Sequence, residues 1–135
     1  MKILVIKFRN IGDVLLTTPL IENLHHYYPD ATIDFALNKG TEAMIEGNPY
    51  INKIHIYDRQ SANSGFFKKL MTELKFIRAI KKEKYDMMIF FSPAGVTSLL
   101  HNHPDFKQGK LQIAAFGPAT CSAVEQAGLR LDLAA

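Results

Sequence analysis

Gly12 and Asp13 mark the first point in the chain where side-chain chemistry is expected. They follow the apolar run at residues 3–6 (ILVI) and precede a stretch with the apolar spacing of a helix, so they lie in a strand-to-helix turn. In an open α/β sheet ligands bind at this carboxyl edge, where an aspartate can act as a general base on a hydroxyl group. The alternative is that Asp13 caps the helix, a contribution of roughly 0.5–2 kcal/mol.

Several turns further along combine small and hydroxyl residues in a way that suits anions. The N-terminus of a helix exposes backbone N–H groups, which bind phosphate or carboxylate groups. Besides Gly12, the candidate anion-binding residues are Thr17, Thr18, Ser92, Gly95, Gly117 and Thr120. The ligand expected there is an adventitious sulfate or phosphate. Residues 7–13 lack the G-x-G-x-x-G pattern of dinucleotide sites, and no cofactor is expected.

The histidines and the cysteine predict neither a metal site nor a covalent nucleophile. The adjacent histidines at 25–26 point to different faces of one helix, which is poor geometry for a shared metal. His101 and His103 lie in a loop without a second cluster of ligands, so zinc is not expected. Cys121 has no paired histidine or cysteine, which favours a buried small residue.

The spacing of apolar residues predicts strands that alternate with helices. Strands are expected at 3–6, 32–37, 53–57, 87–91, 111–115 and 129–133, and helices at 14–28, 42–46, 66–84, 95–100 and 119–127. Pro19 lies inside the first helix, so either that helix kinks or Thr18 caps a second segment with Pro19 in its first turn. The helix at 66–84 has an apolar stripe and a lysine face; we expect it to pack on the sheet, with membrane-surface binding as the alternative.

This alternation predicts a fold of the α/β class, a three-layer sandwich with parallel strands and right-handed crossovers. We expect the Rossmann-like strand order 3-2-1-4-5-6, because six strands divide into two βαβαβ halves; the flavodoxin-like order is the runner-up. No linker is long enough to separate two domains, so residues 1–135 are expected to form a single domain.

Composition narrows the class of protein further. With 135 residues, 47% hydrophobic and 21% charged, the chain has ordinary globular values. A net charge of +3 is too small to indicate nucleic acid binding. One cysteine excludes an internal disulfide and fits a reducing compartment. The apolar run at the start is too short for a signal peptide, and none is long enough for an integral membrane segment. We therefore expect a soluble, cytoplasmic protein.

The first two thirds of the chain carry motifs of one family. The stretches KILVIKFRNIGDVLLTTPLIENL (2–24), YPDATIDFAL (28–37), EGNPYINKI (46–54) and IKKEKYDMMI (80–89) occur in this order. With them, residues 1 to about 86 resemble the N-terminal domain of the lipopolysaccharide heptosyltransferases, glycosyltransferases with a two-domain B-type fold. The resemblance implies that Asp13 is the catalytic aspartate, which this family carries in the first turn.

The remaining third carries motifs of another family. FFSPAGVTSLL (90–100), HPDFKQGK (103–110) and QIAAFGPATCSAVEQAGLRLDLAA (112–135) resemble uroporphyrinogen-III synthase of tetrapyrrole biosynthesis. The resemblance implies that the Ser-Pro turn at 92–93 and the Gly-x-x-Thr turn at 117–120 hold substrate carboxylates in a cleft between two domains. Much of either family's pattern does not appear in this sequence.

The change of family falls inside the strand expected at 87–91, whereas natural fusions join whole domains through linkers. We therefore expect an engineered, recombinant chimera of fragments 1–86 and 87–135 that folds as one domain without native catalytic activity. The alternatives are a heptosyltransferase relative that drifted in sequence, a vestigial heptosyltransferase domain that still binds its acceptor, and a carboxylate- or tetrapyrrole-binding module. Exposed sheet edges would allow a homo-oligomer.

Overall fold

One sheet of parallel strands runs through the molecule. The structure is a computed structural model that describes residues 1–8, 11–58, 60 and 64–135, apart from the side chains at 11, 13 and 102. Its strands are β1 (Lys2–Lys7), β2 (Thr32–Asn38), β3 (Ile51–Tyr57), β4 (Met87–Phe90), β5 (Gln112–Ala115) and β6 (Leu133–Ala134). Every pairing is parallel and the order is β3-β2-β1-β4-β5-β6, so the Rossmann-like order is confirmed.

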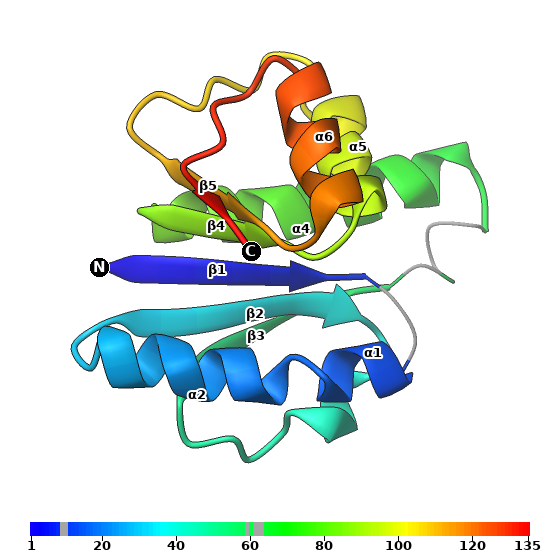
Figure 1. Cartoon of the computed structure of the whole chain (residues 1–135). Coiled ribbons are helices and arrows are strands. Elements are labelled where there is room, and N and C mark those ends of the chain that lie inside the picture. The colour runs from blue at the N-terminus through cyan, green and yellow to red at the C-terminus, as the bar shows by residue number, and fades with distance from the viewer. Residues whose placement is uncertain (9–10, 59, 61–63) are drawn as a thin grey trace.

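Helices cover both faces of this sheet, which confirms the three-layer sandwich (Figure 1). One face carries α1 (Ile11–Leu15), α2 (Thr18–Tyr27) and the 3-10 turn η1 (Glu42–Met44). The opposite face carries α4 (Phe66–Glu83), α5 (Pro93–Asn102) and α6 (Pro118–Gln126). We call these two sides the α2 face and the α4–α5 face.

The first helical segment is interrupted before Pro19. Thr17 is the N-cap of α2 and Pro19 lies in its first turn, which matches the second of the two sequence alternatives with the cap one residue earlier. Proline is tolerated there because the N–H groups of the first turn have no partner within the helix. The break therefore separates α1, at the carboxyl edge, from α2, which lies along the sheet (Figure 1).

The prediction of a strand at 129–133 was wrong in extent, because β6 comprises only Leu133–Ala134. The preceding residues combine one backbone bond with side-chain contacts: the Asp132 N–H donates to the Ile113 carbonyl at 2.8 Å. Asp132 Oδ2 accepts from the Ile113 N–H at 2.8 Å, and Gln108 Oε1 accepts from the Arg130 N–H at 2.7 Å. The two Asp132 contacts pair the edge of β5 at Ile113 without a longer ladder, and no periodic sequence pattern predicts them.

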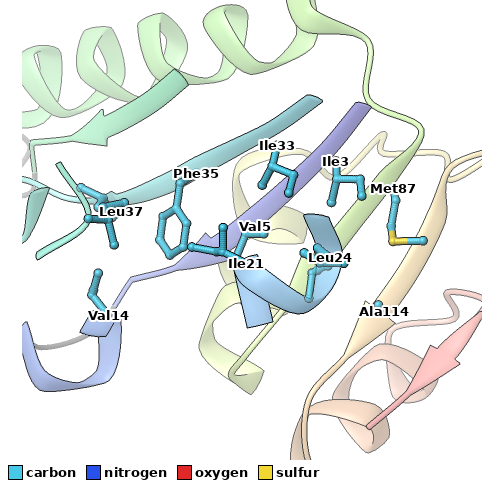
Figure 2. Close-up of a cluster of buried hydrophobic side chains, with 12 residues drawn as sticks. Ile3, Val5, Val14, Ile21, Leu24, Ile33, Phe35, Leu37, Met87 and Ala114 are labelled. Carbon is cyan, nitrogen blue, oxygen red and sulfur yellow. The ribbon is translucent and has the colours of Figure 1, made fainter. Parts of the chain in front are cut away.

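A buried apolar cluster fills the α2 face (Figure 2). Ile21 and Leu24 of α2 lie over β1 and β2, where Ile3, Val5 and Phe35 are fully buried. The cluster continues onto the other half of the sheet. The members from β4 and β5 are Met87, Ile89 and Ala114. One helix thus packs against strands from both halves of the sequence.

A second cluster fills the α4–α5 face. Its floor is formed by side chains that alternate with those of the first cluster, because neighbouring residues of a strand point to opposite faces. The buried members are Leu4, Ile6, Ala36, Met88, Phe90, Val96, Ile113, Ala115 and Val124. Phe76 and Ile80 of α4 and Leu99 of α5 pack against this floor but stay only partly buried.

β4 joins the two halves of the sheet. It pairs with β1 from Ile3↔Met87 to Ile6↔Phe90, and with β5 from Met87↔Gln112 to Phe90↔Ala115. Asp86 extends both ladders. Its N–H donates to the Lys2 carbonyl at 2.8 Å, and its carbonyl accepts from the Gln112 N–H at 2.9 Å. The register is therefore continuous through the centre of the sheet.

Candidate functional site

The turn after β1 lies at the carboxyl edge, as the sequence predicted. Gly12 is exposed within α1, and a Cβ built there would meet no atom within 4 Å. Asp13 belongs to the same helix, but its side chain lies outside the described part of the chain. Its assignment as a catalytic base therefore stays a prediction.

The two threonines that follow have different environments. Thr17 is 1% exposed, and its hydroxyl donates to the Val14 carbonyl at 2.5 Å. Thr18 is half-buried as the first residue of α2. Because the Thr17 hydroxyl is directed into the protein, it serves the break between α1 and α2. Thr18 is the residue of this pair that can reach solvent.

The turn between β4 and α5 is used for packing. Ser92 is the N-cap of α5, where no side-chain cap bond forms, and it is 8% exposed. Gly95 is buried, and a Cβ at that position would lie 3.2 Å from Cδ1 of Phe90. This glycine therefore lets α5 approach β4 closely. That contact accounts for Gly95 without a ligand.

The turn between β5 and α6 has a similar structure. Gly117 is the N-cap of α6 with φ +82°, a conformation that favours glycine. Its N–H donates to the Ala135 carbonyl, and Thr120 is 3% exposed. The fold thus brings the candidate residues to one edge of the sheet, at the ends of β1, β4 and β5. Three of the four hydroxyl-bearing residues, namely Thr17, Ser92 and Thr120, are buried.

A polar network that sequence reasoning missed lies at the other end of the sheet, on the α4–α5 face. Asp34 of β2 is fully buried, and its Oδ2 accepts from the Tyr85 hydroxyl at 2.6 Å. Asn52 donates to Asp34 Oδ1 at 2.9 Å. The Tyr85 hydroxyl lies 2.8 Å from His55 Nε2. Because this hydroxyl donates to Asp34, it accepts from His55, which places the imidazole proton on Nε2.

Lysines surround this network and connect it to the end of α4. Lys2 Nζ lies 3.8 Å from Asp34 Oδ2, and both Lys2 and Lys53 pair with Glu83. Hydrogen bonds from these two lysines lower the pKa of Glu83 to about 2. Burial lowers the pKa of His55, so the ring is neutral at pH 7. Burial, with the hydrogen bond to Asp34, raises the pKa of Tyr85.

This network is suited to holding structure rather than to proton transfer. Tyr85 is a poor acid at neutral pH, and Asp34 already accepts hydrogen bonds on both oxygens. The sequence did contain a signal: TIDFALN places one carboxylate in an otherwise apolar buried strand. Because a buried charge requires partners, the presence of Asp34 in this strand predicts a polar network around it. It does not predict which residues complete that network.

The structure gives no support for a metal centre or a membrane span. In the described part of the chain, no three His, Cys, Asp or Glu side chains are grouped so that they could hold a metal ion. None of the helices described has the length and apolarity needed to cross a bilayer. Cys121 is half-buried, and its Sγ lies 3.6 Å from the Ala115 carbonyl oxygen, which fits the expected packing role.

The strand order and the turns at the carboxyl edge define a Rossmann-like α/β protein. Residues 45–135, well over half of the chain, match the uroporphyrinogen-III synthase HemD family, and the chain belongs to this family. It is also 36% identical over 89 residues to lipopolysaccharide heptosyltransferase 3 of Escherichia coli (strain K12), and 32% identical over 89 residues to a second Escherichia coli heptosyltransferase 3. The two-family resemblance is therefore confirmed.

The heptosyltransferase matches cover 66% of this chain, which spans about a quarter of the length of these relatives. The HemD match and the 89-residue matches together exceed 135 residues, so they overlap. Part of the chain therefore resembles both families. The HemD match begins at residue 45, well before the change of family expected near Tyr85, and the boundary at 86–87 stays a prediction.

Solved structures with the same fold include heptosyltransferases. E. coli heptosyltransferase WaaC with ADP-2-deoxy-2-fluoro heptose has a TM-score of 0.68 at 17% identity, covering 88% of this chain and 38% of that one. E. coli ADP-heptose lps heptosyltransferase II has a TM-score of 0.61 at 19% identity, covering 86% and 30%. At these identities the likeness shows the fold alone.

Proposed function

We propose that this chain is an engineered chimera of two α/β fragments, residues 1–86 and 87–135, whose property is to fold as one domain without native catalytic activity. The similarity to two families within 135 residues supports this proposal. A recombination inside β4 would place β1–β3 and α4 in one fragment, and α5, β5, α6 and β6 in the other.

The observation that carries the proposal is the continuity of the core across β4. Met87 and Ile89 share one buried cluster with Ile21 and Phe35, which come from the first fragment. A chain of two independently folding units would instead contain two cores with few contacts between them. The pairing of β4 with both β1 and β5 supports a single folding unit in the same way.

The lack of activity is proposed from the carboxyl edge. Thr17, Ser92 and Thr120 are at most 8% exposed, and the Thr17 hydroxyl already donates to the Val14 carbonyl, so these turns offer a ligand little side-chain surface. A free sulfate or phosphate would then bind weakly, if at all, and no specific carboxylate substrate would be held. Nucleic acid is not a proposed partner, given the net charge of +3.

Unfolding in urea tests the single domain. Far-ultraviolet circular dichroism reports on the helices, and the fluorescence of the five tyrosines reports on tertiary structure. We expect both signals to give one cooperative transition with the same midpoint. Two separated transitions, or a broad non-cooperative one, would contradict the proposal. The full 135-residue chain is the protein to use.

Two assays test the absence of activity. The chain is incubated with ADP-heptose and a lipopolysaccharide acceptor, and separately with hydroxymethylbilane. We expect no turnover above a buffer blank in either assay. Turnover in the first that is abolished by Asp13→Asn would establish the alternative function, a vestigial heptosyltransferase domain, which the 36% identity to heptosyltransferase 3 favours. Turnover or tight binding in the second would establish a tetrapyrrole-binding module.

Self-association through the sheet edges is also proposed. β3 and β6 are the two edge strands, and an unpaired edge is a template for pairing with another chain. Sedimentation analysis over a range of concentrations measures this directly. A concentration-dependent dimer would support the proposal, and a monomer at all concentrations would refute it.

A further inference from the structure

A groove of about 560 Å³ lies on the α4–α5 face, between the two helices for which that face is named. Its floor consists of Leu4, Ile6 and Met88. Apolar side chains form both walls: Phe76, Ile77 and Ile80 from α4, and Ala94 and Leu99 from α5. The groove is therefore lined by hydrocarbon along its length, and its volume lies within the range of small-molecule sites, about 300–1,000 Å³.

Cations gather at one end of this groove. α4 ends and β4 begins at the amino edge of the sheet, and the loop at 103–111 leads to the start of β5 at the same edge. The groove-lining cationic and imidazole side chains there are Lys81, Lys84, His101, His103 and Lys107. Burial and the nearby charge of Lys81 lower the pKa of His103, which fits a common location for the two.

The opposite end of the groove is different. Glu73 is the carboxylate that lines it, and this residue accepts from the Tyr57 hydroxyl at 3.4 Å, near the carboxyl edge. Lys69, one helical turn before Glu73, lines the same end, so a lysine and a carboxylate occur together there. The groove thus has an apolar middle, a lysine-rich end without a lining carboxylate, and an end where one lysine is accompanied by a carboxylate. This distribution of charge favours an anionic ligand whose charged group lies at the lysine-rich end.

We propose that this groove binds a free amphipathic anion, namely a medium-chain fatty acid, with its alkyl chain along the floor and its carboxylate at the lysine end. The apolar walls favour an alkyl chain over a polar ligand, because burying hydrocarbon against Phe76 and Leu99 removes surface from water. Lysine ammonium groups form charge-assisted hydrogen bonds with carboxylates. The inference concerns the groove alone and does not depend on a chimeric origin.

Calorimetric titration with sodium dodecanoate, kept below its critical micelle concentration, tests the site. We expect saturable binding of one molecule per chain. Acetate supplies the carboxylate without the alkyl chain, and dodecyltrimethylammonium supplies the alkyl chain with the opposite charge. Neither should saturate the protein in the same concentration range. No saturable binding of dodecanoate, or equal affinity for the cationic amphiphile, would overturn the proposal.

Two matched pairs of variants locate the bound molecule. Ala94 and Ala119 each follow the first proline of a helix, and both are exposed, but only Ala94 lines the groove. Ala94→Phe should therefore weaken dodecanoate binding by about tenfold or more, because the ring occupies part of the groove. Ala119→Phe should leave the affinity within about twofold. Equal effects of the two variants would show that the fatty acid binds elsewhere.

The second pair consists of two double variants that each remove two lysines and therefore have the same net charge. Lys81→Gln with Lys107→Gln removes two groove cations, whereas Lys75→Gln with Lys82→Gln removes two exposed lysines that do not line the groove. The first double variant should lose about three- to tenfold in affinity, since each exposed ion pair contributes modestly. The second should change little. Equal losses would mean that net charge alone attracts the anion, and the directed site would be refuted.

Nuclear magnetic resonance gives a readout separate from affinity. A carboxylate bound among these lysines should raise the pKa of His103, because a nearby negative charge favours the imidazolium. His26 is an exposed histidine of α2 on the opposite face and serves as the internal control. A shift of both histidines, or of neither, would contradict the assigned position. A dimer that covers the groove and excludes dodecanoate would also overturn the proposal.

Discussion

The two faces of the sheet differ in how helices pack over the proposed junction in β4. On the α2 face, a helix from the first fragment lies over strands of both fragments, and Leu24 shares a closed cluster with Met87 and Ala114 (Figure 2). On the α4–α5 face, the helices on either side of β4 come from different fragments, and a groove separates them. The strand ladder itself is continuous beneath both faces.

This difference separates three requirements of recombination. A parallel ladder needs only matching backbone geometry, which any pair of equivalent strands supplies. A helix that crosses the junction needs apolar strand residues of about the right size beneath it. Contact between two helices also requires that their side chains interdigitate, because ridges of one must fit grooves of the other. Under the proposed recombination, the groove lies where the third requirement, interdigitation of helices from different fragments, is met least well.

The largest expected effect concerns the buried polar network around Asp34, which connects to the end of α4 beside that groove. Asp34→Ala removes the acceptor of Tyr85 and Asn52 and leaves His55 and Lys2 beside an empty position. Breaking a buried charge network by deleting one member costs about 3–5 kcal/mol. Urea unfolding measures this loss, and Asp30→Ala on the exposed turn before β2 is the control. A loss below about 1 kcal/mol would mean that the network does not stabilise the α4–α5 face.

Adjacent methionines of β4 compare the two faces directly. Met87 is buried in the α2-face cluster, and Met88 lies on the groove floor. Met87→Ala should cost about 3 kcal/mol in free energy of unfolding, within the usual range of about 2–5 for such truncations. Met88→Ala should cost about 1–2 kcal/mol, because water already reaches the groove and no closed cavity forms.

Chemical denaturation of both variants under identical conditions provides the measurement. The two residues are of the same type and adjacent in β4, so the difference between their losses reports on their environments. Equal losses, or a larger loss for Met88→Ala, would show that the α4–α5 face is packed as tightly as the α2 face. The contrast between the faces would then fail.

Acid should weaken the α4–α5 face in two steps. The folded-state pKa of His55 is lowered by burial below its usual 6.5, and that of Glu83 is lowered by Lys2 and Lys53 from 4.5 to about 2. Since the unfolded chain binds protons first in both cases, stability is present above pH 6.5 and falls as the pH drops. The contribution of His55 to stability is lost just below pH 6.5, and that of Glu83 is lost between about pH 4.5 and pH 2.

Urea midpoints measured from pH 8 to pH 2 test this dependence. Glu83→Gln should flatten the loss below pH 4.5 and keep the step of His55 below pH 6.5, whose pKa falls further because the Glu83 charge raises it in the parent chain. Glu125→Gln, on the exposed surface of α6, should leave both steps as they are in the parent chain. An unchanged profile below pH 4.5 for Glu83→Gln would refute the role given to its two lysine partners.

Sequence patterns predicted more of the fold than of the sites. Apolar runs and the helix spacing around Leu24 gave the alternation of elements, and two βαβαβ halves gave the strand order, because burial of one face is a local and periodic requirement. The Asp34–Tyr85 contact joins residues 51 positions apart, and no period reports such a pair. At the carboxyl edge the turns were placed, but whether Thr17 or Ser92 faces solvent depends on packing by other elements.

The smallest expected effect lies at the residue that ends α4. Lys84 is the non-glycine residue with a positive φ, 51°, in the described part of the chain, and it caps the helix in the left-handed region. This conformation costs a side chain roughly 1–2 kcal/mol, which glycine avoids. Glycine also gives the unfolded chain more freedom, which offsets part of that gain. Lys84→Gly should therefore stabilise the protein by about 0.5 kcal/mol.

Thermal and urea unfolding of Lys84→Gly, with Lys84→Ala as the matched control, separate backbone strain from charge. Both variants remove the same lysine from the groove rim, but only glycine relieves the left-handed residue. We expect Lys84→Gly to be more stable than Lys84→Ala by about 1 kcal/mol. Equal stability would mean that the turn between α4 and β4 relaxes on substitution. The junction would then contain a flexible link on the groove side, where the comparison of the two faces places the weaker packing.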